Sequence, residues 1–327
     1  MKFTRSLTTG ALALALALPL AHSASAAGKY PDRAIHMIVP FSAGGIVDSL
    51  ARIVAEPLSK RLGQAVIVEN KAGAGGAIGT EYVARSAPDG YTLLVVSPGH
   101  AVQPLLNKSA RWNPTRDFRG IAEAGIVPNI IVVPSASPIK TLPELIAAAK
   151  AKPGEITYGT AGIGTSNHLS GELLAQMAGV KLVQVPYKGQ PEALNDLLTG
   201  RLSMMPLTTA LAVPHIRDGK LRALAVTTRT KSSTLPDLPT VATAANLPDY
   251  DVGTWFGFVA PAKIPDAVQQ QLSKDIVAIL KTPEVVKRLQ GLGMEMDPQD
   301  GQHFDQYVAA EYKKWSDVLN KAGLAVH

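Results

Sequence analysis

Short apolar runs alternate with stretches of helical periodicity along most of this 327-residue chain. Runs of strand length lie at 35–39, 65–68, 92–96, 129–133, 155–158, 182–185, 202–205, 222–227 and 257–260. Apolar residues at helical spacing occupy 46–62, 142–151, 168–178 and 191–199, and three C-terminal segments at 265–281, 283–291 and 301–321. Strands that alternate with helices favour α/β layers with mostly parallel sheets. The pattern therefore predicts an α/β protein in which helices flank each sheet.

The first apolar run leads through a glycine-containing loop directly into a helix. After Pro40, this loop contains Phe41, Ser42, Ala43, Gly44 and Gly45. The first N–H groups of a helix lack partners within it, and their partial positive charge suits an anion. No arginine or lysine lies between Ile38 and Ala51, so peptide groups are expected to hold that anion. Asp48 lies in the first helical turn, where it either complements the helix dipole or contacts the ligand through water or an amine.

A second sequence of strand, glycine-rich loop and helix lies at 155–178. Its candidate ligand contacts are Thr160, Ala161, Gly162, Gly164, Thr165, Ser166 and His168. Thr165 or Ser166 is expected to cap the helix. Two such units indicate two lobes that face one cleft, the first formed by 27–127 and 253–327 and the second by 128–252. The C-terminal helices are expected to return to the first lobe.

Two further candidate segments follow predicted strands. Ligands in open α/β sheets gather at the carboxyl ends of the strands. Ser97 and His100 follow the run at 92–96, and Tyr187 and Lys188 follow the run at 182–185. The glycines at 73–79 imitate a dinucleotide fingerprint, but their spacing and their distance from the preceding strand favour a packing turn. No cofactor is expected.

The N-terminal residues have the pattern of a cleaved Sec export signal. Lys2 and Arg5 precede an apolar stretch at 11–20, and Ala24-Ser25-Ala26 fits a cleavage site. Residues 1–26 hold these two basic residues and no acidic one, so their removal lowers the formal net charge from +6 to +4. No basic stripe for nucleic acid is present. The chain has no cysteine, and its seven histidines show no metal-ligand spacing, so neither disulfides nor a metal site is expected.

Several motifs, in order from residue 31 to the C-terminus, resemble one family. They are Pro31-Asp32-Arg33, Val39-Pro40-Phe41 with Gly44-Gly45-x-x-Asp48, Ala51-Arg52, Glu69-Asn70-x-x-Gly73-x-Gly75-Gly76-x-Ile78-Gly79, Ala87-Pro88-Asp89-Gly90-Tyr91-Thr92-Leu93-Leu94, His168-Leu169-Ser170-Gly171-Glu172-Leu173, Pro186-Tyr187-Lys188-Gly189, Pro214-His215-Ile216, the run from Gly219 to Val226, and Leu235-Pro236-Asp237-Leu238-Pro239-Thr240-Val241. Together they resemble the Bug-type (TctC-like) solute receptors of tripartite tricarboxylate transporters.

The resemblance implies a two-lobed periplasmic binding protein of the Venus-flytrap kind, type II-like. Such receptors hold a carboxylate of a small organic acid between the first and second loops, largely through backbone N–H groups and waters. The contacts carry over to 41–45 with Asp48, and to 160–166 with His168. The implied partners are one large and one small integral permease subunit, and the receptor is expected to be a monomer.

Two departures from the family pattern concern the cleft. Val47 stands where members often have a threonine, and Leu207-Thr208-Thr209-Ala210-Leu211 replaces a more polar segment. Both changes favour a mono- or dicarboxylate with an apolar body over a citrate-like tricarboxylate.

Two alternative functions fit parts of the sequence. An exported sensor would need the same ligand-driven closure as a transport receptor. A secreted serine hydrolase would use Ser166 and His168, although no acid can be assigned as the third member of a triad.

Overall fold

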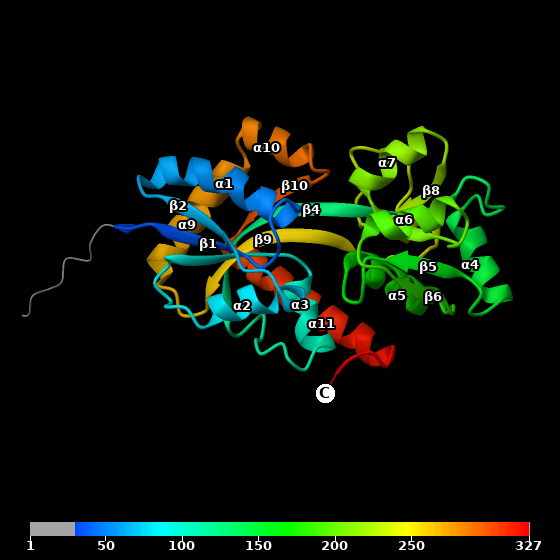
Figure 1. Cartoon of the computed structure of the whole chain (residues 1–327), viewed down its shortest axis with the longest axis horizontal. Coiled ribbons are helices and arrows are strands. Elements are labelled where there is room, and N and C mark those ends of the chain that lie inside the picture. Colours follow the sequence, from blue (N-terminus) through cyan, green and yellow to red (C-terminus); the bar gives the residue numbers. More distant parts are fainter. Residues whose placement is uncertain (1–29, 327) are drawn as a thin grey trace, which may run out of the picture.

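The computed structural model describes residues 30–326 and shows two α/β lobes (Figure 1). Two strands run between the lobes, β4 (Phe118–Pro134) and β9 (Gly253–Pro261). The first part of β4 pairs with β9, whereas its last residues, from Asn129 on, pair with strands of the second lobe. One long strand thus belongs to both sheets. The expected export signal at 1–26 lies outside the described residues.

The first lobe is built on a mixed sheet in the order β10-β4-β9-β3-β1-β2. Its other strands are β1 (Ile35–Val39), β2 (Val66–Asn70), β3 (Thr92–Val96) and β10 (Glu295–Asp300). Strand β1 pairs in parallel with β2 and β3. The remaining pairs of this sheet are antiparallel: β3 with β9, β9 with β4, and β4 with β10. The two crossing strands, β4 and β9, thus run in opposite directions between the lobes.

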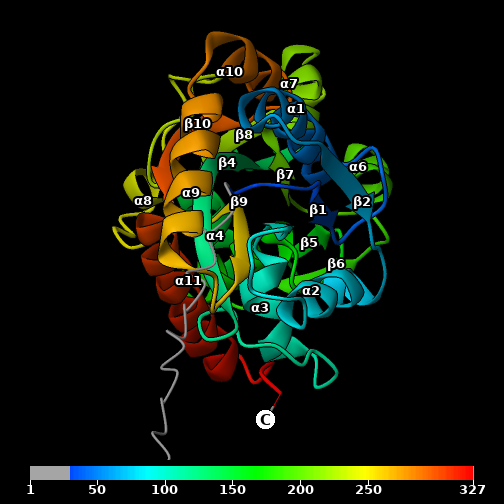
Figure 2. The ribbon, with the colours of Figure 1, turned by 90° about the vertical axis from the view of Figure 1, so that its left-hand side faces the viewer.

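Helices cover both faces of this sheet, because apolar side chains alternate along β1. Ile35, Met37 and Val39 pack with α1 (Ile46–Leu62), α9 (Asp266–Leu280) and α10 (Pro283–Gln290). Ile38, on the opposite face, packs in a cluster with residues of α2 (Ala77–Ala84) and α11 (Gly301–Lys321). Figure 2 shows the strands between these two helical layers.

The second lobe pairs β5 (Thr157–Thr160) in parallel with β6 (Val183–Pro186). Strands β7 (Met205–Thr208) and β8 (Leu221–Val226) lie antiparallel to the end of β4. The helices of this lobe are α4 (Leu142–Ala151), α5 (Ser166–Ala178), α6 (Gln190–Leu198), α7 (Thr209–Arg217) and the short α8 (Val241–Ala244).

The C-terminal helix does not stay with the first lobe. Helix α11 begins beside β4, but Trp315, Val318 and Leu319 at its end pack into the same apolar cluster as Leu169 and Leu173 of α5. Helix α3 (Gly99–Leu106) contributes to this cluster as well. Helices α9 and α10 thus pack on the sheet of the first lobe, whereas α11 contacts both lobes.

The α/β class and the two-lobed architecture are confirmed (Figure 1), and several element bounds differ from the expectation. The helix predicted at 142–151 forms with those bounds, and Thr141 caps it by accepting a hydrogen bond from the backbone N–H of Glu144. The strand predicted at 202–205 is wrong, since β7 begins only at Met205. Helices α2, α3 and α7 were not predicted. Each contains or follows glycine or proline, which obscure a helical pattern.

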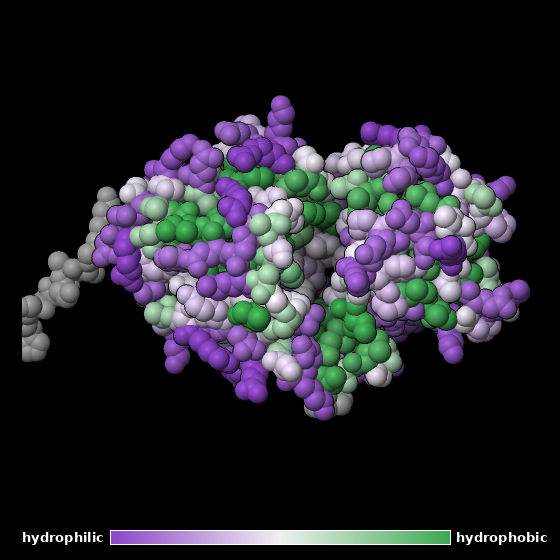
Figure 3. Space-filling model, in the orientation of Figure 1, coloured by the Kyte–Doolittle hydropathy of each residue, from purple (hydrophilic) through white to green (hydrophobic). Residues whose placement is uncertain are grey.

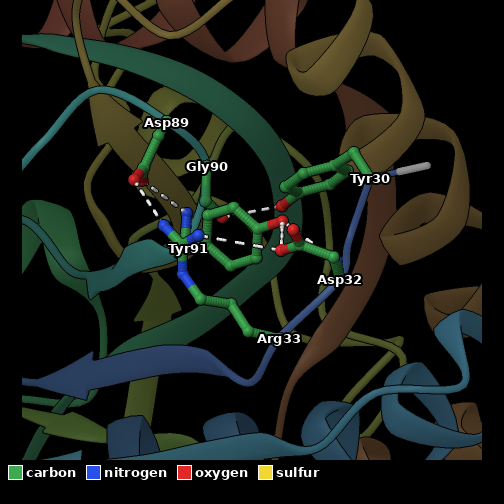
Figure 4. Close-up of polar contacts among 6 residues, drawn as sticks. All are labelled: Tyr30, Asp32, Arg33, Asp89, Gly90 and Tyr91. Carbon is green, nitrogen blue, oxygen red and sulfur yellow. Dashed lines mark hydrogen bonds and ion pairs between the residues drawn. The ribbon is translucent and has the colours of Figure 1, made fainter. Parts of the chain in front are cut away.

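Two of the motifs that carry the resemblance meet at the amino ends of β1 and β3, away from the cleft (Figure 4). The Tyr30 hydroxyl donates to the carbonyl of Gly90 (2.7 Å), and the Tyr91 hydroxyl donates to a carboxylate oxygen of Asp32 (2.6 Å). The Arg33 guanidinium lies over the Tyr91 ring, 3.7 Å from its centroid, and donates to Asp89. These contacts fasten the start of the described chain to the loop that precedes β3.

Candidate functional site

A cavity of about 480 Å³ lies between the lobes, where the space-filling surface is hollowed (Figure 3). Both lobes and both crossing strands contribute to its lining. The lining residues are Phe41, Gly45, Ile46, Val47, Asp48, Gly75, Ser97, Pro98, Gly99, Gln103, Val127, Ala161, Ile163, Gly164, Thr165, Ser166, Asn167, Gln190, Thr208, Thr254 and Phe256. A larger hollow of about 780 Å³ lies between α9 and α11 and includes none of the predicted site residues. The inter-lobe cavity is therefore the candidate site.

The first wall of the cavity is the start of α1. Gly45 precedes the helix with φ −81° and ψ 173°, and no side chain caps this end. The first N–H groups of the helix, those of Ile46 and Val47, thus have no partner within it. Both residues line the cavity. The structure places the predicted anion-binding helix start at the cavity.

The Asp48 carboxylate is hydrogen-bonded by groups of the first lobe alone. Its carboxylate accepts hydrogen bonds from the Gly44 N–H (3.0 Å), the Arg52 guanidinium (3.1 Å) and the Asn70 amide (2.9 Å). The Arg52 hydrogen bond, the main cause, lowers the pKa of Asp48 to about 2 although burial opposes the shift. Asn70 also donates to the carbonyl of Phe41, so the network fixes the loop. The negative charge of Asp48 is therefore paired and does not repel an anionic ligand as a free carboxylate would.

The second wall is the start of α5. Thr165 caps this helix, since its hydroxyl oxygen accepts a hydrogen bond from the His168 N–H (3.5 Å). Ala161, Gly164, Thr165 and Ser166 all line the cavity. Gly164 has φ +81°, a left-handed conformation that favours glycine. The two helix starts that the sequence predicted as anion sites thus share one cavity.

His168 supports the second loop from a position outside the cavity lining. Its side chain is 1% exposed, and its Nδ1 accepts a hydrogen bond from the Gly164 N–H (3.2 Å). Burial lowers the pKa of His168, and the Glu172 carboxylate opposes that shift. A neutral imidazole is the form that can accept from Gly164. His168 lies outside the cavity lining and acts on it through the loop.

Ser166 and His168 form no catalytic pair among the described residues. The Ser166 hydroxyl oxygen accepts a hydrogen bond from the Thr254 hydroxyl (2.7 Å), which lies on β9. The His168 ring faces the Gly164 N–H on one side and Glu172, 3.8 Å away, on the other. The geometry gives no support to a serine nucleophile activated by His168.

Other predicted contacts lie outside the lining. Ser42, Ala43 and Gly44 are exposed at the outer side of the first loop. Thr160 and Gly162 are tied into the turn of the second loop by the hydrogen bond from the Gly162 N–H to the Thr160 hydroxyl (3.2 Å). His100 is buried against Phe118, and this burial lowers its pKa to about 3.

Tyr187 and Lys188, which follow β6, also lie outside the cavity lining. The Tyr187 hydroxyl donates to Asp196 (2.8 Å), and Lys188 is exposed. Ser97 does line the cavity, as predicted. The residue that reaches the cavity from this segment is Gln190, which directly follows the Pro186–Gly189 motif.

Sequence reasoning missed the side-chain amides of the cavity lining, whereas Thr254, Trp255 and Phe256 were candidates because they lie near the second crossing between the lobes. Gln103, Asn167 and Gln190 supply amide groups, and Thr208 lies in the segment already noted as a departure from the family pattern. Thr254 and Phe256 lie on a crossing strand, which is a signal for a cleft residue. Trp255, between them, is fully buried and packs on Phe304 and Tyr307.

Two searches of residues 30–326 bear on other classes of function. No group of three or more metal-ligating side chains is present in this part of the chain. No helix within the same range has the length and apolar character needed to cross a membrane.

The fold and the shared cavity define the class of two-lobed solute-binding proteins. The model of the family described as "Tripartite tricarboxylate transporter family receptor" matches residues 50–324. The chain belongs to this family of receptors, which bind solutes and are not enzymes, so the serine hydrolase hypothesis is wrong.

Three solved structures are similar over nearly the whole described chain. BugD, a periplasmic binding protein, is 37% identical with a TM-score of 0.72, and the match covers 90% of this chain and 99% of BugD. Rpa4515 of R. palustris, solved with adipate, is 34% identical with a TM-score of 0.75, over 90% and 99% of the two chains. MatC of Rhodopseudomonas palustris, solved with malate, is 31% identical with a TM-score of 0.71, over 89% and 100%. Membership in this family of periplasmic binding proteins places the chain in the periplasm.

Proposed function

We propose that this protein captures a small organic carboxylate in the inter-lobe cavity and delivers it to a tripartite tricarboxylate-type permease. The observation that carries the proposal is that α1 and α5, from different lobes, both begin at one cavity. Family membership supports transport, and the ligands of Rpa4515 and MatC, adipate and malate, are both carboxylates. The ligand carboxylate lies between the two helix starts, at the carboxyl ends of β1 and β5.

The energetics of such a contact suit a reversible receptor. Each charge-assisted hydrogen bond contributes about 1.5–3 kcal/mol net. Three or four N–H donors from the two helix starts therefore supply most of the roughly 8 kcal/mol of a micromolar complex. Asp48 does not oppose this binding, because Arg52, Asn70 and the Gly44 N–H occupy its carboxylate.

The remaining parts of the proposal concern assembly. The first lobe is formed by 27–127 with 253–327 and the second by 128–252. The chain passes between them at 127–131, within β4, and at 249–254, where β9 begins. The receptor is exported by a Sec signal at 1–26, works as a monomer, and docks on a permease with one large and one small integral subunit.

The first experiment is a thermal-shift screen of the exported protein against monocarboxylates, dicarboxylates, amino acids and neutral sugars. A ligand at a hundredfold its Kd stabilises the folded state by about 2.7 kcal/mol. For a chain of this size, each kcal/mol raises the Tm by about 2–4 °C. Shifts confined to carboxylates support the proposal, whereas shifts with sugars alone contradict it.

The Gly45→Val variant tests the position of the ligand. Gly45 has an extended backbone, and a Cβ added there meets no atom within 4 Å, so valine folds without a clash. Its branched side chain projects beside the helix start at the cavity, and we expect the affinity to fall by about tenfold or more, the equivalent of 1.4 kcal/mol. Ser42→Val, in the same loop but outside the lining, is the matched control. Unchanged affinity in Gly45→Val would exclude a carboxylate at this helix start.

Transport and sensing are separated in cells. Deletion of the gene is expected to abolish uptake of the ligand identified in the screen. Normal uptake with loss of ligand-induced transcription would instead assign the receptor to a signalling partner.

A further inference from the structure

The start of α5 presents a buried amide whose orientation is fixed by the protein. Asn167, the second residue of the helix, lines the inter-lobe cavity although only 1% of the residue is exposed. Its Nδ2 donates to the carbonyl of Pro206 on β7 (2.5 Å) and to the Oδ1 of Asn129 on β4 (3.4 Å). Because a carbonyl oxygen can only accept, the nitrogen of the Asn167 amide lies on the Pro206 side.

A second chain of contacts gives the same orientation. The Ser170 hydroxyl donates to the carbonyl of Ser166 (2.7 Å), so its oxygen is left to accept from the Nδ2 of Asn129 (3.5 Å). The Oδ1 of Asn129 then faces Asn167 and accepts from it. Both N–H groups of the Asn167 amide are thus used by neighbouring protein groups, and its Oδ1 remains.

The remaining oxygen of Asn167 is open to the cavity. Among residues 30–326, no donor makes a hydrogen bond to this Oδ1, and the fully enclosed side-chain polar atoms without a partner belong to His100 and His215 instead. Since Asn167 borders the inter-lobe cavity, its Oδ1 faces that space. Gln190, whose amide oxygen accepts from the N–H and the hydroxyl of Thr208, also lines the cavity but makes no hydrogen bond with Asn167 in the described chain.

A buried acceptor of this kind discriminates between ligands. When a ligand fills the cavity, an acceptor that loses its water and receives no donor in return weakens binding. A site built to hydrogen-bond an O–H or N–H group therefore rejects analogues that lack this group. Asn167 lies in the first turn of α5, beside the N–H groups proposed to hold the ligand carboxylate. The donor that it recognises accordingly lies close to that carboxylate.

We propose that Asn167 is a specificity-determining residue, and that the ligand is an organic acid with a hydroxyl or amino group on carbon 2 or carbon 3. This inference rests on the proposed function, because it takes the ligand carboxylate to lie at the two helix starts. The hydroxyl or amino group donates to the Asn167 Oδ1. The proposal is independent of the number of carboxylates, so monoacids and diacids that carry such a donor both qualify.

Calorimetric titration of the wild-type protein with matched acids tests the proposal. For straight-chain mono- and diacids of four, five and six carbons, the parent acid is compared with its hydroxy, amino and fluoro derivatives at carbon 2 and at carbon 3. Fluorine is close to a hydroxyl group in size but cannot donate a hydrogen bond. At the best chain length, the best hydroxy or amino acid is expected to bind about tenfold or more tightly than the parent acid and the matching fluoro acid.

A variant assigns this preference to the Asn167 oxygen. Asn167→Leu has nearly the size of the wild-type side chain but no acceptor, and it is expected to reduce the preference for the hydroxy or amino acid by about tenfold. Asn195→Leu, the same exchange at an exposed position on α6 outside the lining, is the matched control and keeps the preference. Because Asn167→Leu also loses the hydrogen bond to Pro206, its folding is checked by circular dichroism, and the comparison of hydroxy with fluoro acids on the wild type stands without it.

The outcomes separate this inference from the proposed function. If the parent or fluoro acids bind as tightly as every hydroxy and amino derivative, or if folded Asn167→Leu keeps the preference, the role of Asn167 is refuted while the carboxylate receptor stands. If no carboxylate of any kind binds, the proposed function fails and the inference fails with it.

Discussion

Replacement of Asp48 by asparagine tests whether this carboxylate is a support of the first loop. The carboxylate accepts from three donors, two of them neutral groups at Gly44 and Asn70 and the third the Arg52 guanidinium. An asparagine keeps one acceptor oxygen but turns an N–H₂ group toward one of these donors. We expect the variant to fold and to be less stable than the wild type at neutral pH.

The pKa shift gives the size of the effect. Arg52, Gly44 and Asn70 lower the pKa of Asp48 from 3.8 to about 2, and the side chain is only 6% exposed. Each pKa unit corresponds to 1.36 kcal/mol, so the ionised carboxylate stabilises the folded state by about 2 kcal/mol. A depressed acid pKa contributes stability that is complete above pH 3.8 and is lost as the pH falls through about 2.

The measurement is the free energy of unfolding by urea for both proteins between pH 7 and pH 2. The difference between wild type and Asp48→Asn is expected to be about 2 kcal/mol at pH 7 and to shrink below pH 4. Asp317→Asn, which removes an exposed carboxylate paired with Lys313, is expected to change little at any pH. A difference for Asp48→Asn that is absent, or that does not depend on pH, would refute the network as the source of the shift.

Two further substitutions test the packing and electrostatics of the scaffold. Burial, with Asp297 and Glu311 nearby, raises the pKa of Glu123 from 4.5 to about 7, so its ionisation destabilises the folded state as the pH rises through this range. The free energy of unfolding of Glu123→Gln, measured by calorimetry, should therefore exceed that of the wild type by up to about 3 kcal/mol at pH 8 and nearly equal it at pH 4.5. A difference between the two proteins that does not grow with pH would contradict this. A Cβ on Gly171 would lie 2.3 Å from the Tyr158 ring, so Gly171→Ala should cost about 1–3 kcal/mol in urea unfolding. Gly99→Ala, whose Cβ meets only an ordinary contact at 3.8 Å, is its control, and equal stabilities would show that Tyr158 moves aside freely.

The fold was predictable where local pattern and tertiary pairing agree. The helix at Leu142–Ala151 has a threonine cap, a regular apolar face and a proline-glycine turn after it, and its predicted bounds are confirmed. Strand β4 was predicted only as 129–133, because its first half contains Gly120, Glu123 and Gly125. These residues pair with β9 and β10, and the register of the β4–β9 pair shifts between Glu123 and Gly125. Pairing between distant strands leaves no local pattern in the sequence from which it could be predicted.

The candidate site was predictable at the backbone level and less so for side chains. Glycine-rich turns before helices identified both helix starts, since these features are local in sequence. The role of Arg52 as the partner of Asp48 and the orientation of Gln190 set by Thr208 depend on contacts between separate elements. The role of His168 was equally hard to predict, because only the folded turn brings its ring to the Gly164 N–H.

The distribution of charge explains how one cavity can combine selectivity with release. Under the proposed function, the ligand carboxylate is held by peptide N–H groups from both lobes, so neither helix start alone offers all the donors. When the lobes separate, the ligand loses the hydrogen bonds from one lobe and water replaces them, so its affinity falls. No lysine, arginine or histidine of the described lining has to give up an ion pair with the ligand in this step. The Asp48–Arg52 pair keeps its partners within the first lobe, and Gln190 keeps Thr208 within the second. Each wall thus keeps, within one lobe, the hydrogen bonds that fix its geometry.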